Sequence, residues 1–341
     1  MTAPPATEPA PPSRLRRFLG AALPWVSMMI AIASAILMDR GPKGARTVAV
    51  GAVTLWVVLL VALVLHRRAG GDAASRLVRG AWRSALMLTQ SAIQLALFFA
   101  VPLYWLAWAR TGAQLVFLVV LSLAALVSLW DPLTERILHH PGLGPVLPAV
   151  ACFSALNAVL PGFGVSTSAS LWIASAATAL ALPVGLLRVH AEARALRLQI
   201  LGTLVVMVLL PLSIALGAAR WIPAAPLSLA EVAIGTRMSG REVADPLERL
   251  SRPPRVLVCA TAIRAPLGVH ERLYHVWRQD GELRDRIPLE IEGGREQGFR
   301  TWSRKRNFGD DPRGTWTCAV ETGLGQSLGE QAIVIAPDAE R

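Results

Sequence analysis

The sequence predicts a fold in two parts: an α-helical transmembrane bundle of about seven spans, followed by a C-terminal antiparallel all-β sandwich domain. Three observations predict it. The 341 residues are 53% hydrophobic with a mean hydropathy of +0.47, which is too apolar for an ordinary soluble domain. The long apolar runs end by residue 219, and charged residues become frequent after it. Beyond residue 226, short alternating segments separated by turn residues replace the apolar runs.

These changes in composition divide the chain into three segments. We expect a disordered cytoplasmic tail over 1–17, a transmembrane domain over 18–219 and an extracytoplasmic β-sandwich over 220–341. The first segment is rich in Pro and Ala, so it has too few large apolar side chains to build a core. The basic cluster Arg14–Arg17 before the apolar run 18–38 also resembles the start of a signal peptide. Because that run is long enough to cross a bilayer, we favour an uncleaved first helix.

Seven apolar runs have the length of a membrane span. They lie at about 18–38, 46–65, 85–109, 112–130, 144–161, 169–187 and 197–219. Each has roughly 18–25 residues, which cross about 30 Å of hydrocarbon at about 1.5 Å per residue. Within such a segment a helix satisfies every backbone N–H and C=O internally. We therefore predict seven transmembrane helices.

The basic residues between the runs predict the orientation of this bundle. With the N-terminus inside, the inner flanks hold twelve arginines, whereas the outer flanks hold Arg40, Lys43, Arg46 and Arg110. Positive residues favour the cytoplasmic side, so we expect the N-terminus in the cytoplasm. Seven spans then place the C-terminal domain in the periplasm, on the outer side of a bacterial inner membrane. One span more or fewer would reverse that placement.

The net charge of +11 does not indicate nucleic-acid binding. Residues 1–219 contain 16 Lys and Arg against 6 Asp and Glu, whereas residues 220–341 contain 18 against 17. The excess therefore belongs to the loops between spans, where it sets the orientation and meets the bilayer. The lipid bilayer is the expected partner, and nucleic acid is not.

Seven short strands are predicted in the C-terminal segment. They lie at 227–236, 255–263, 272–279, 286–292, 298–305, 315–322 and 330–336. Turn signals separate them, among them Asp280-Gly281 and Gly293-Gly294. Short alternating strands with no helical pattern between them are typical of an antiparallel sandwich.

Alternation along these strands also predicts which side chains face the core. Trp316 and Cys318 share the apolar face of the strand 315–322, and Cys259 lies on the corresponding face of 255–263. Cys259 and Cys318 are therefore candidates for a disulfide, which would suit an oxidising compartment. The alternative is a pair of buried free thiols.

Several features of the C-terminal segment resemble a family of unknown function, DUF 2914. They are His275-Val276-Trp277 with Gly281 after it, the GFRTWSRK run at 298–305, Gly314-Thr315-Trp316 and Gly325-Gln326. The similarity covers about 227–336. The helical part is similar to a multi-span family, DUF 5924, mainly in hydropathy and arrangement. The resemblance implies a small extracytoplasmic β-domain on a membrane anchor and implies no established activity.

A ligand-binding face is expected on the strand that carries GFRTWSRK. Arg300, Trp302 and Arg304 alternate to one side of it and form an outward face on which guanidinium groups stack on the indole. Together with Tyr274 and Trp277 they are the candidate ligand-binding residues. An exposed indole beside guanidinium groups suits sugar rings or phosphorylated glycans of a cell envelope. The competing interpretation places most of the aromatic side chains in the core and makes the basic run a solvated edge that prevents aggregation.

Catalytic and metal sites are not predicted. His275 and Ser303 are a base and a nucleophile on predicted strands, but no nucleophile elbow or metalloprotease helix accompanies them, so a structural histidine is the better interpretation. His270, His275 and the two cysteines of the C-terminal segment lack the paired spacing of zinc ligands. We expect no catalytic residue, no metal and no cofactor.

Two classes of function remain open. The first is a membrane-anchored binding or sensory module whose periplasmic sandwich engages an envelope glycan or a partner protein. The second is a small-molecule transporter or membrane enzyme with its site among the helices, where Gln90, Gln94 and Asn157 are the polar candidates. The interiors of the predicted spans contain no Asp, Glu, Lys or Arg, which coupled transport normally requires, and this favours the first class.

Overall fold

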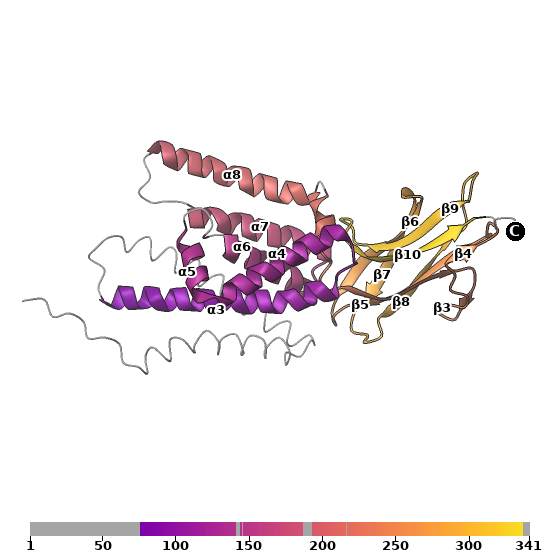
Figure 1. Cartoon of the computed structure of the whole chain (residues 1–341), viewed down its shortest axis with the longest axis horizontal. Coiled ribbons are helices and arrows are strands. Elements are labelled where there is room, and N and C mark those ends of the chain that lie inside the picture. Colours follow the sequence, from indigo (N-terminus) through magenta and orange to yellow (C-terminus); the bar gives the residue numbers. More distant parts are fainter. Residues whose placement is uncertain (1–75, 141–143, 145, 187–192, 216, 337–341) are drawn as a thin grey trace, which may run out of the picture.

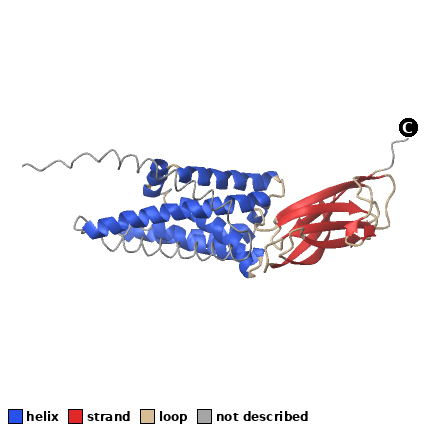
Figure 2. Ribbon diagram, turned by 90° about the horizontal axis from the view of Figure 1, so that it is seen from below, coloured by secondary structure: helices blue, strands red, loops and turns tan. Residues whose placement is uncertain are grey.

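The computed structural model of the chain describes residues 76–140, 144, 146–186, 193–215 and 217–336. A helical region and a β-domain follow each other along the long axis of the molecule (Figure 1). Figure 2 shows the same end-to-end arrangement, with all helices on one side and all strands on the other. The predicted tail at 1–17 and the predicted spans at 18–38 and 46–65 lie outside the described residues.

Helices occupy the described chain up to residue 221. They are α3 (Arg76–Leu106), α4 (Gly112–Leu129), α5 (Asp131–His139), α6 (Val146–Val159), η1 (Leu160–Phe163), α7 (Thr167–Leu186), α8 (Ala193–Ala215) and η2 (Ala218–Trp221). The side chain of Thr111 caps α4 by accepting a hydrogen bond from the backbone N–H of Gln114 at 3.4 Å. Pro132 stands in the first turn of α5, where its missing N–H has no helical partner to lose.

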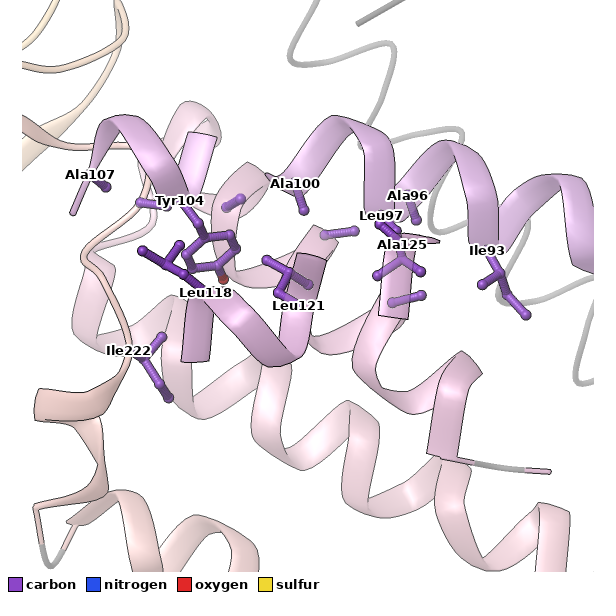
Figure 3. Packing of buried hydrophobic residues seen from close by; sticks show 14 of the residues in the cluster. Ile93, Ala96, Leu97, Ala100, Tyr104, Ala107, Leu118, Leu121, Ala125 and Ile222 are labelled. Atoms are coloured by element: carbon purple, nitrogen blue, oxygen red, sulfur yellow. The ribbon is translucent and has the colours of Figure 1, made fainter. Parts of the chain in front are cut away.

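An apolar core holds α3, α4 and α6 together. Figure 3 shows Leu97 and Tyr104 of α3 beside Leu118 and Leu121 of α4. Alanines fill most of the remaining positions of the cluster, including Ala100, which lets the helix backbones approach closely. The cluster also includes Ile222, which already belongs to the connection with the β-domain.

The prediction of a seven-span bundle is wrong. Among the described residues, two helical stretches are long and apolar enough to cross a membrane, Gly112–Leu129 and Val146–Phe163. The other apolar helical stretches among those residues, Gln90–Leu106 of α3 and Ile200–Ser213 of α8, are shorter than the roughly 20 residues of a typical span.

The outer surface of α4 is apolar. Only 28% of the residues of Gly112–Leu129 are buried in the structure. Its large exposed side chains are Leu115, Val116, Val119, Val120, Leu123 and Leu126. A contiguous apolar face of this kind is costly in water and marks a membrane or protein contact, so the helical region suits a membrane environment.

The β-domain consists of two sheets packed face to face and a small hairpin. Its strands are β1 (Ser228–Gly235), β2 (Met238–Ser239), β3 (Glu242–Val243), β4 (Arg249–Leu250), β5 (Leu257–Arg264), β6 (His270–Gln279), β7 (Glu282–Glu292), β8 (Phe299–Lys305), β9 (Gly314–Glu321) and β10 (Ser327–Ile335). One sheet has the order β1-β5-β8, the other has the order β4-β10-β9-β6-β7, and β2 pairs with β3. Asp280 (φ 48°) and Gly281 (φ 86°) form the β6–β7 turn, as a tight hairpin with two left-handed residues requires.

The β-domain is present as predicted, but it is not all antiparallel. β4 runs parallel to β10, with Arg249 and Leu250 opposite Val334 and Ile335. The seven predicted strands coincide with β1 and β5–β10 to within a few residues. The three that the sequence did not predict, β2, β3 and β4, are two residues long, which is too short to produce an alternating pattern.

Buried polar contacts fix the β-domain against the helices. Gln326, in the β9–β10 turn, donates from Nε2 to the carbonyl oxygens of Ile222 (3.1 Å) and Pro223 (3.4 Å) in the connecting segment. Gln114, at the start of α4, donates from Nε2 to the carbonyl oxygen of Ser327 at 2.9 Å. Both glutamines are buried, and so is the connecting segment 222–225. The connection between the two regions is therefore a packed junction rather than a flexible linker.

Glu271 adds a third contact at the same junction. Its Oε2 accepts a hydrogen bond from the backbone N–H of Thr167, in the first turn of α7, at 2.5 Å. The positive end of the helix dipole favours a carboxylate there. Burial raises the pKa of Glu271, and the hydrogen bonds from Thr167 act against that rise. The start of α7 is thus capped by a residue of β6.

Replacing Gln326 tests the junction. Gln326→Ala leaves the buried carbonyl oxygen of Ile222 without its donor, whereas that of Pro223 keeps the hydrogen bond from Ala225 N–H, so we expect a loss of about 1–3 kcal/mol of unfolding free energy. Denaturant unfolding of the detergent-solubilised chain measures it. Gln331→Ala is the matched control, because Gln331 bonds the carbonyl of Ala332 at an exposed site and its loss should be near zero. Equal effects of the two substitutions would contradict a packed junction.

Candidate functional site

The outer face of the β1-β5-β8 sheet carries the predicted Arg-Trp-Arg row. Trp302 is 41% exposed and Arg304 is exposed, both on β8. Their cross-strand neighbours are small or aliphatic, with Ala260 opposite Trp302 and Val258 opposite Arg304. Because these neighbouring side chains are short, part of the apolar surface of the indole is accessible to solvent.

Arg300, the third member of the row, is held by two carboxylates. Its Nη1 lies 3.1 Å from Oε2 of Glu231 on β1 and 2.9 Å from Oε1 of Glu242 on β3. The guanidinium is thereby neutralised, and it is not the stacking partner of Trp302. In the described chain, guanidinium groups lie over the rings of Tyr274 and Phe299 instead. The expectation that Arg300 would pair with a bound anion is not favoured by this geometry.

Tyr274 and Trp277 do not join the row. Tyr274 lies on the outer face of the other sheet, and the guanidinium of Arg286 sits 4.0 Å from its ring centroid. Trp277 points into the core and is 0% exposed. The five predicted binding residues therefore separate into three places, and the surface of β8 is the one that brings several together.

A buried polar cluster lies between the sheets. His275 of β6 contacts Thr261 Oγ1 of β5 through Nε2 at 3.0 Å and Ser303 Oγ of β8 through Nδ1 at 2.8 Å. The indole N–H of Trp277 donates to Ser303 Oγ at 3.2 Å, and Thr261 Oγ1 donates to the carbonyl oxygen of Thr301 at 3.5 Å. All donors are used when Ser303 donates to Nδ1 and His275 carries its proton on Nε2. The contacts thus assign a neutral tautomer of His275.

Burial keeps this imidazole uncharged. Desolvation lowers the pKa of His275 to about 4. His275 is fully buried and Ser303 nearly so, so neither side chain reaches a substrate in this conformation. The pair that the sequence offered as base and nucleophile is therefore a structural element that joins the two sheets.

The predicted disulfide is confirmed. Cys259 of β5 and Cys318 of β9 are bonded, with their Cα atoms 6.5 Å apart, and so connect the two sheets. The two sulfurs and a ring nitrogen of His275 all lie within 4.8 Å of one another. Metal binding requires thiolates, which the bonded sulfurs do not provide, so this trio does not fit a metal while the disulfide is intact.

Sequence reasoning missed the role of Lys305. It lies in the basic run, yet its side chain turns inward and forms an ion pair with Asp285 of β7. Its Nζ lies 5.5 Å from the ring centroid of Trp316. Its place in the alternation, two residues after the inward Ser303, is the signal that indicates this direction.

Gln94 and Asn157, two buried amides of the helical region, make interhelical hydrogen bonds. Gln94 donates from Nε2 to the carbonyl oxygen of Ser128 on α4 at 2.6 Å. Asn157 of α6 donates from Nδ2 to the hydroxyl of Tyr104 on α3 at 2.8 Å. These contacts assign Gln94 and Asn157 to helix packing and do not favour a substrate path through them.

Two family models match the chain. A family of unknown function, DUF 5924, matches residues 12–253, and a protein of unknown function, DUF 2914, matches residues 270–334. The chain belongs to the DUF 5924 family. Both resemblances predicted from the sequence, and their order, are confirmed. No curated protein and no solved structure matches the chain.

The boundary between the two matches does not fall between the helices and the β-domain. The DUF 2914 match begins at β6, later than the expected start at 227. Strands β1–β4 instead fall within the DUF 5924 match, together with the helices. This division agrees with the packed junction, because the first strands follow a connection that is buried against the helices.

Alkylation tests the disulfide. The chain has three cysteines, of which Cys152 is free. With a maleimide–polymer reagent under denaturing conditions without reductant, we expect one adduct, and after reduction three. Three adducts without reductant would contradict the bond between Cys259 and Cys318.

His275 should make stability depend on pH. The unfolded imidazole takes up a proton near its ordinary pKa of 6.5, whereas the folded one does so only near 4. The unfolded state therefore binds more protons than the folded state between these two pH values. The contribution of the neutral His275 to the unfolding free energy is thus intact above about pH 6.5 and is lost as the pH falls toward 4. The loss is roughly 3 kcal/mol.

Denaturant unfolding between these pH values measures this effect in the wild type and in His275→Gln. The variant should lose most of the pH dependence of its unfolding free energy. His270→Gln changes an exposed histidine on the same strand and should retain it. A wild-type slope that survives in His275→Gln would show that other groups carry it.

Proposed function

We propose that the chain is a multi-pass membrane-anchored binding module. Its β-domain lies on the periplasmic side and engages a ligand of the cell envelope through the outer face of β8. A glycan is the ligand that the geometry favours, and a partner protein is the other member of the same class. The observation that carries the proposal is the exposed indole of Trp302, beside polar groups that are already ordered.

The distribution of arginines supports the orientation without a count of spans. In the described helical region, Arg76, Arg79, Arg83, Arg136, Arg194 and Arg197 lie in the first turns of α3 and α8 or in α5. These segments are at the end of the molecule opposite the β-domain (Figure 1). Arg110 and Arg220 are in the segments next to the β-domain. Because positive residues favour the cytoplasmic side, this asymmetry supports an extracytoplasmic β-domain.

The dimensions of α4 support its insertion across the bilayer. Its 18 residues are about 27 Å long, close to the thickness of the hydrocarbon core. Exposed aromatic side chains flank the helical region at both ends, with Trp130 after α4 and with Phe163 and Trp221 near the β-domain. Amphipathic rings are enriched where the hydrocarbon meets the headgroups.

The environment of Trp302 supports a binding role for the outer face of β8. Of the three tryptophans on the strands, Trp277 and Trp316 are fully buried, whereas Trp302 is 41% exposed. Arg300 is two residues away on the same face, about 6.6 Å along the strand. Its guanidinium and the carboxylates of Glu231 and Glu242 form a fixed set of donors and acceptors beside the indole. Sugar rings bind to such surfaces through stacking and hydroxyl hydrogen bonds.

The transporter or membrane enzyme is less well supported. Gln94 and Asn157, two of its polar candidates, already bond to neighbouring helices. A substrate that bonded to these amides would first have to displace those contacts. The exposed face of β8 requires no such rearrangement to meet a ligand.

Substitution of Trp302 tests the proposal. The full chain in nanodiscs is applied to immobilised peptidoglycan fragments and lipopolysaccharide core oligosaccharides. Loss of the stacking surface in Trp302→Ala should lower the affinity for the bound glycan about tenfold or more, which corresponds to about 1.4 kcal/mol. Glu242→Gln should weaken binding less, because Glu231 still holds Arg300.

The matched control is Leu283→Ala. Leu283 is also an exposed apolar residue of the β-domain, but it lies on β7 at the β6–β7 turn. Its substitution should leave binding unchanged. Glycan binding that is insensitive to Trp302→Ala would overturn the assignment of the face.

A further inference from the structure

We infer that the β-domain itself contacts the membrane surface, through the β5–β6 loop with Leu267 at its tip. The partner is the headgroup layer of the bilayer in which the helices stand, so the inference rests on the membrane anchoring in the proposed function. It adds a second attachment of the β-domain, separate from the outer face of β8.

Leu267 is presented outward by a rigid loop. Its side chain is 55% exposed. The β7–β8 loop holds the segment on both sides, because Gly293 N–H donates to the carbonyl oxygen of Val269 at 2.8 Å and Gly294 N–H donates to that of Ala265 at 2.9 Å. Gly294 leaves room for the leucine, since a Cβ there would lie 2.5 Å from Leu267 Cδ1. An exposed leucine held this firmly is a fixed feature of the surface.

The β5–β6 loop lies beside the last residues of the candidate span Val146–Phe163. A Cβ on Gly268 would lie 3.7 Å from the carbonyl oxygen of Gly162, so the loop is in close contact with η1. Gly162 is one residue before the end of the candidate span Val146–Phe163. Phe163 itself is exposed beside this contact. A side chain next to the last residue of a spanning segment lies in the layer between hydrocarbon and water.

Basic side chains next to the loop suit lipid phosphate groups. Arg264, at the end of β5, is exposed, and its Nε donates to the carbonyl oxygen of Glu296 at 3.0 Å. That bond fixes the position of the Arg264 side chain and does not use the two terminal nitrogens of its guanidinium. Arg295 is also exposed and follows Gly294, which packs under Leu267. An apolar tip with arginines at its base is the arrangement of an interfacial membrane contact.

Fluorescence quenching by spin-labelled lipid tests the inference. The full chain with Cys152→Ala is reconstituted in phosphatidylcholine vesicles that contain lipid with a nitroxide near the headgroup end of the acyl chain. The fluorophore NBD is attached to single cysteines introduced as Leu267→Cys, Leu283→Cys or Val120→Cys, while the native disulfide remains unreactive. We expect NBD at position 267 to be quenched and shifted to the blue, as an interfacial probe is.

Position 283 is the matched control. Leu283 is about as exposed as Leu267, at 61% against 55%. It lies at the start of β7, beside the last residue of β6, whereas Leu267 lies before the first residue of β6. NBD at position 283 should show the unquenched emission of a probe in water. Quenching at 267 equal to that at 283 would overturn the membrane contact of the loop.

Position 120 separates the failure of this inference from the failure of the anchoring. Val120 lies in the middle of α4 on its exposed face. A blue-shifted probe at 120, with a probe at 267 that behaves as in water, would overturn the loop contact while the anchoring stands. Emission typical of water at all three positions would overturn both.

Discussion

Gln326 connects the β9–β10 turn to the backbone of the segment that leaves the helices, and the arrangement of the whole molecule depends on that contact. Its amide donates to two carbonyl groups that are buried and have left their helix. The carbonyl of Pro223 also accepts from Ala225 N–H, so it is the buried carbonyl of Ile222 that would cost free energy comparable to a lost hydrogen bond without Gln326. Gln114 and Glu271 make the corresponding contacts from α4 and β6. Together they fix the β-domain on one end of the helices, so the direction of its faces relative to the helices is determined.

Within the β-domain, a different set of contacts holds the two sheets together. The disulfide joins β5 to β9, while His275 of β6 bonds to β5 and β8. Buried polar groups are favourable only when every donor and acceptor is paired, and the tautomer assigned to His275 achieves that. The rigid interior leaves the outer face of β8 and the β5–β6 loop as its candidate sites of interaction. The outer face of β8 carries Trp302 and points away from the core. The β5–β6 loop carries Leu267 and lies beside the end of the candidate span Val146–Phe163.

Much of the β-domain was predictable because alternation in a strand is a strong constraint. It placed Trp316, Cys318 and Cys259 inward, and the structure bears this out. The partners of Arg300 were not predictable, because Glu242 belongs to a two-residue strand without a pattern of its own. Trp277 alternates with His275 and Leu273 on one face of β6, and the apolar Leu273 marks that face as the core face. The assignment of Trp277 as a binding residue is therefore wrong.

The number of spans was the least predictable feature. Hydropathy alone marks apolar runs and does not separate a helix that faces lipid from one that packs in a core: Val146–Phe163 is 56% buried in the structure, whereas Gly112–Leu129 is 28% buried. The proposed orientation does not depend on that number, because the arginine-rich helix ends and the β-domain lie at opposite ends of one packed body. A C-terminal fusion to alkaline phosphatase, compared with one to green fluorescent protein, measures this side directly. Phosphatase activity without fluorescence is the expected result, whereas a fluorescent fusion without phosphatase activity would place the β-domain in the cytoplasm and contradict the account.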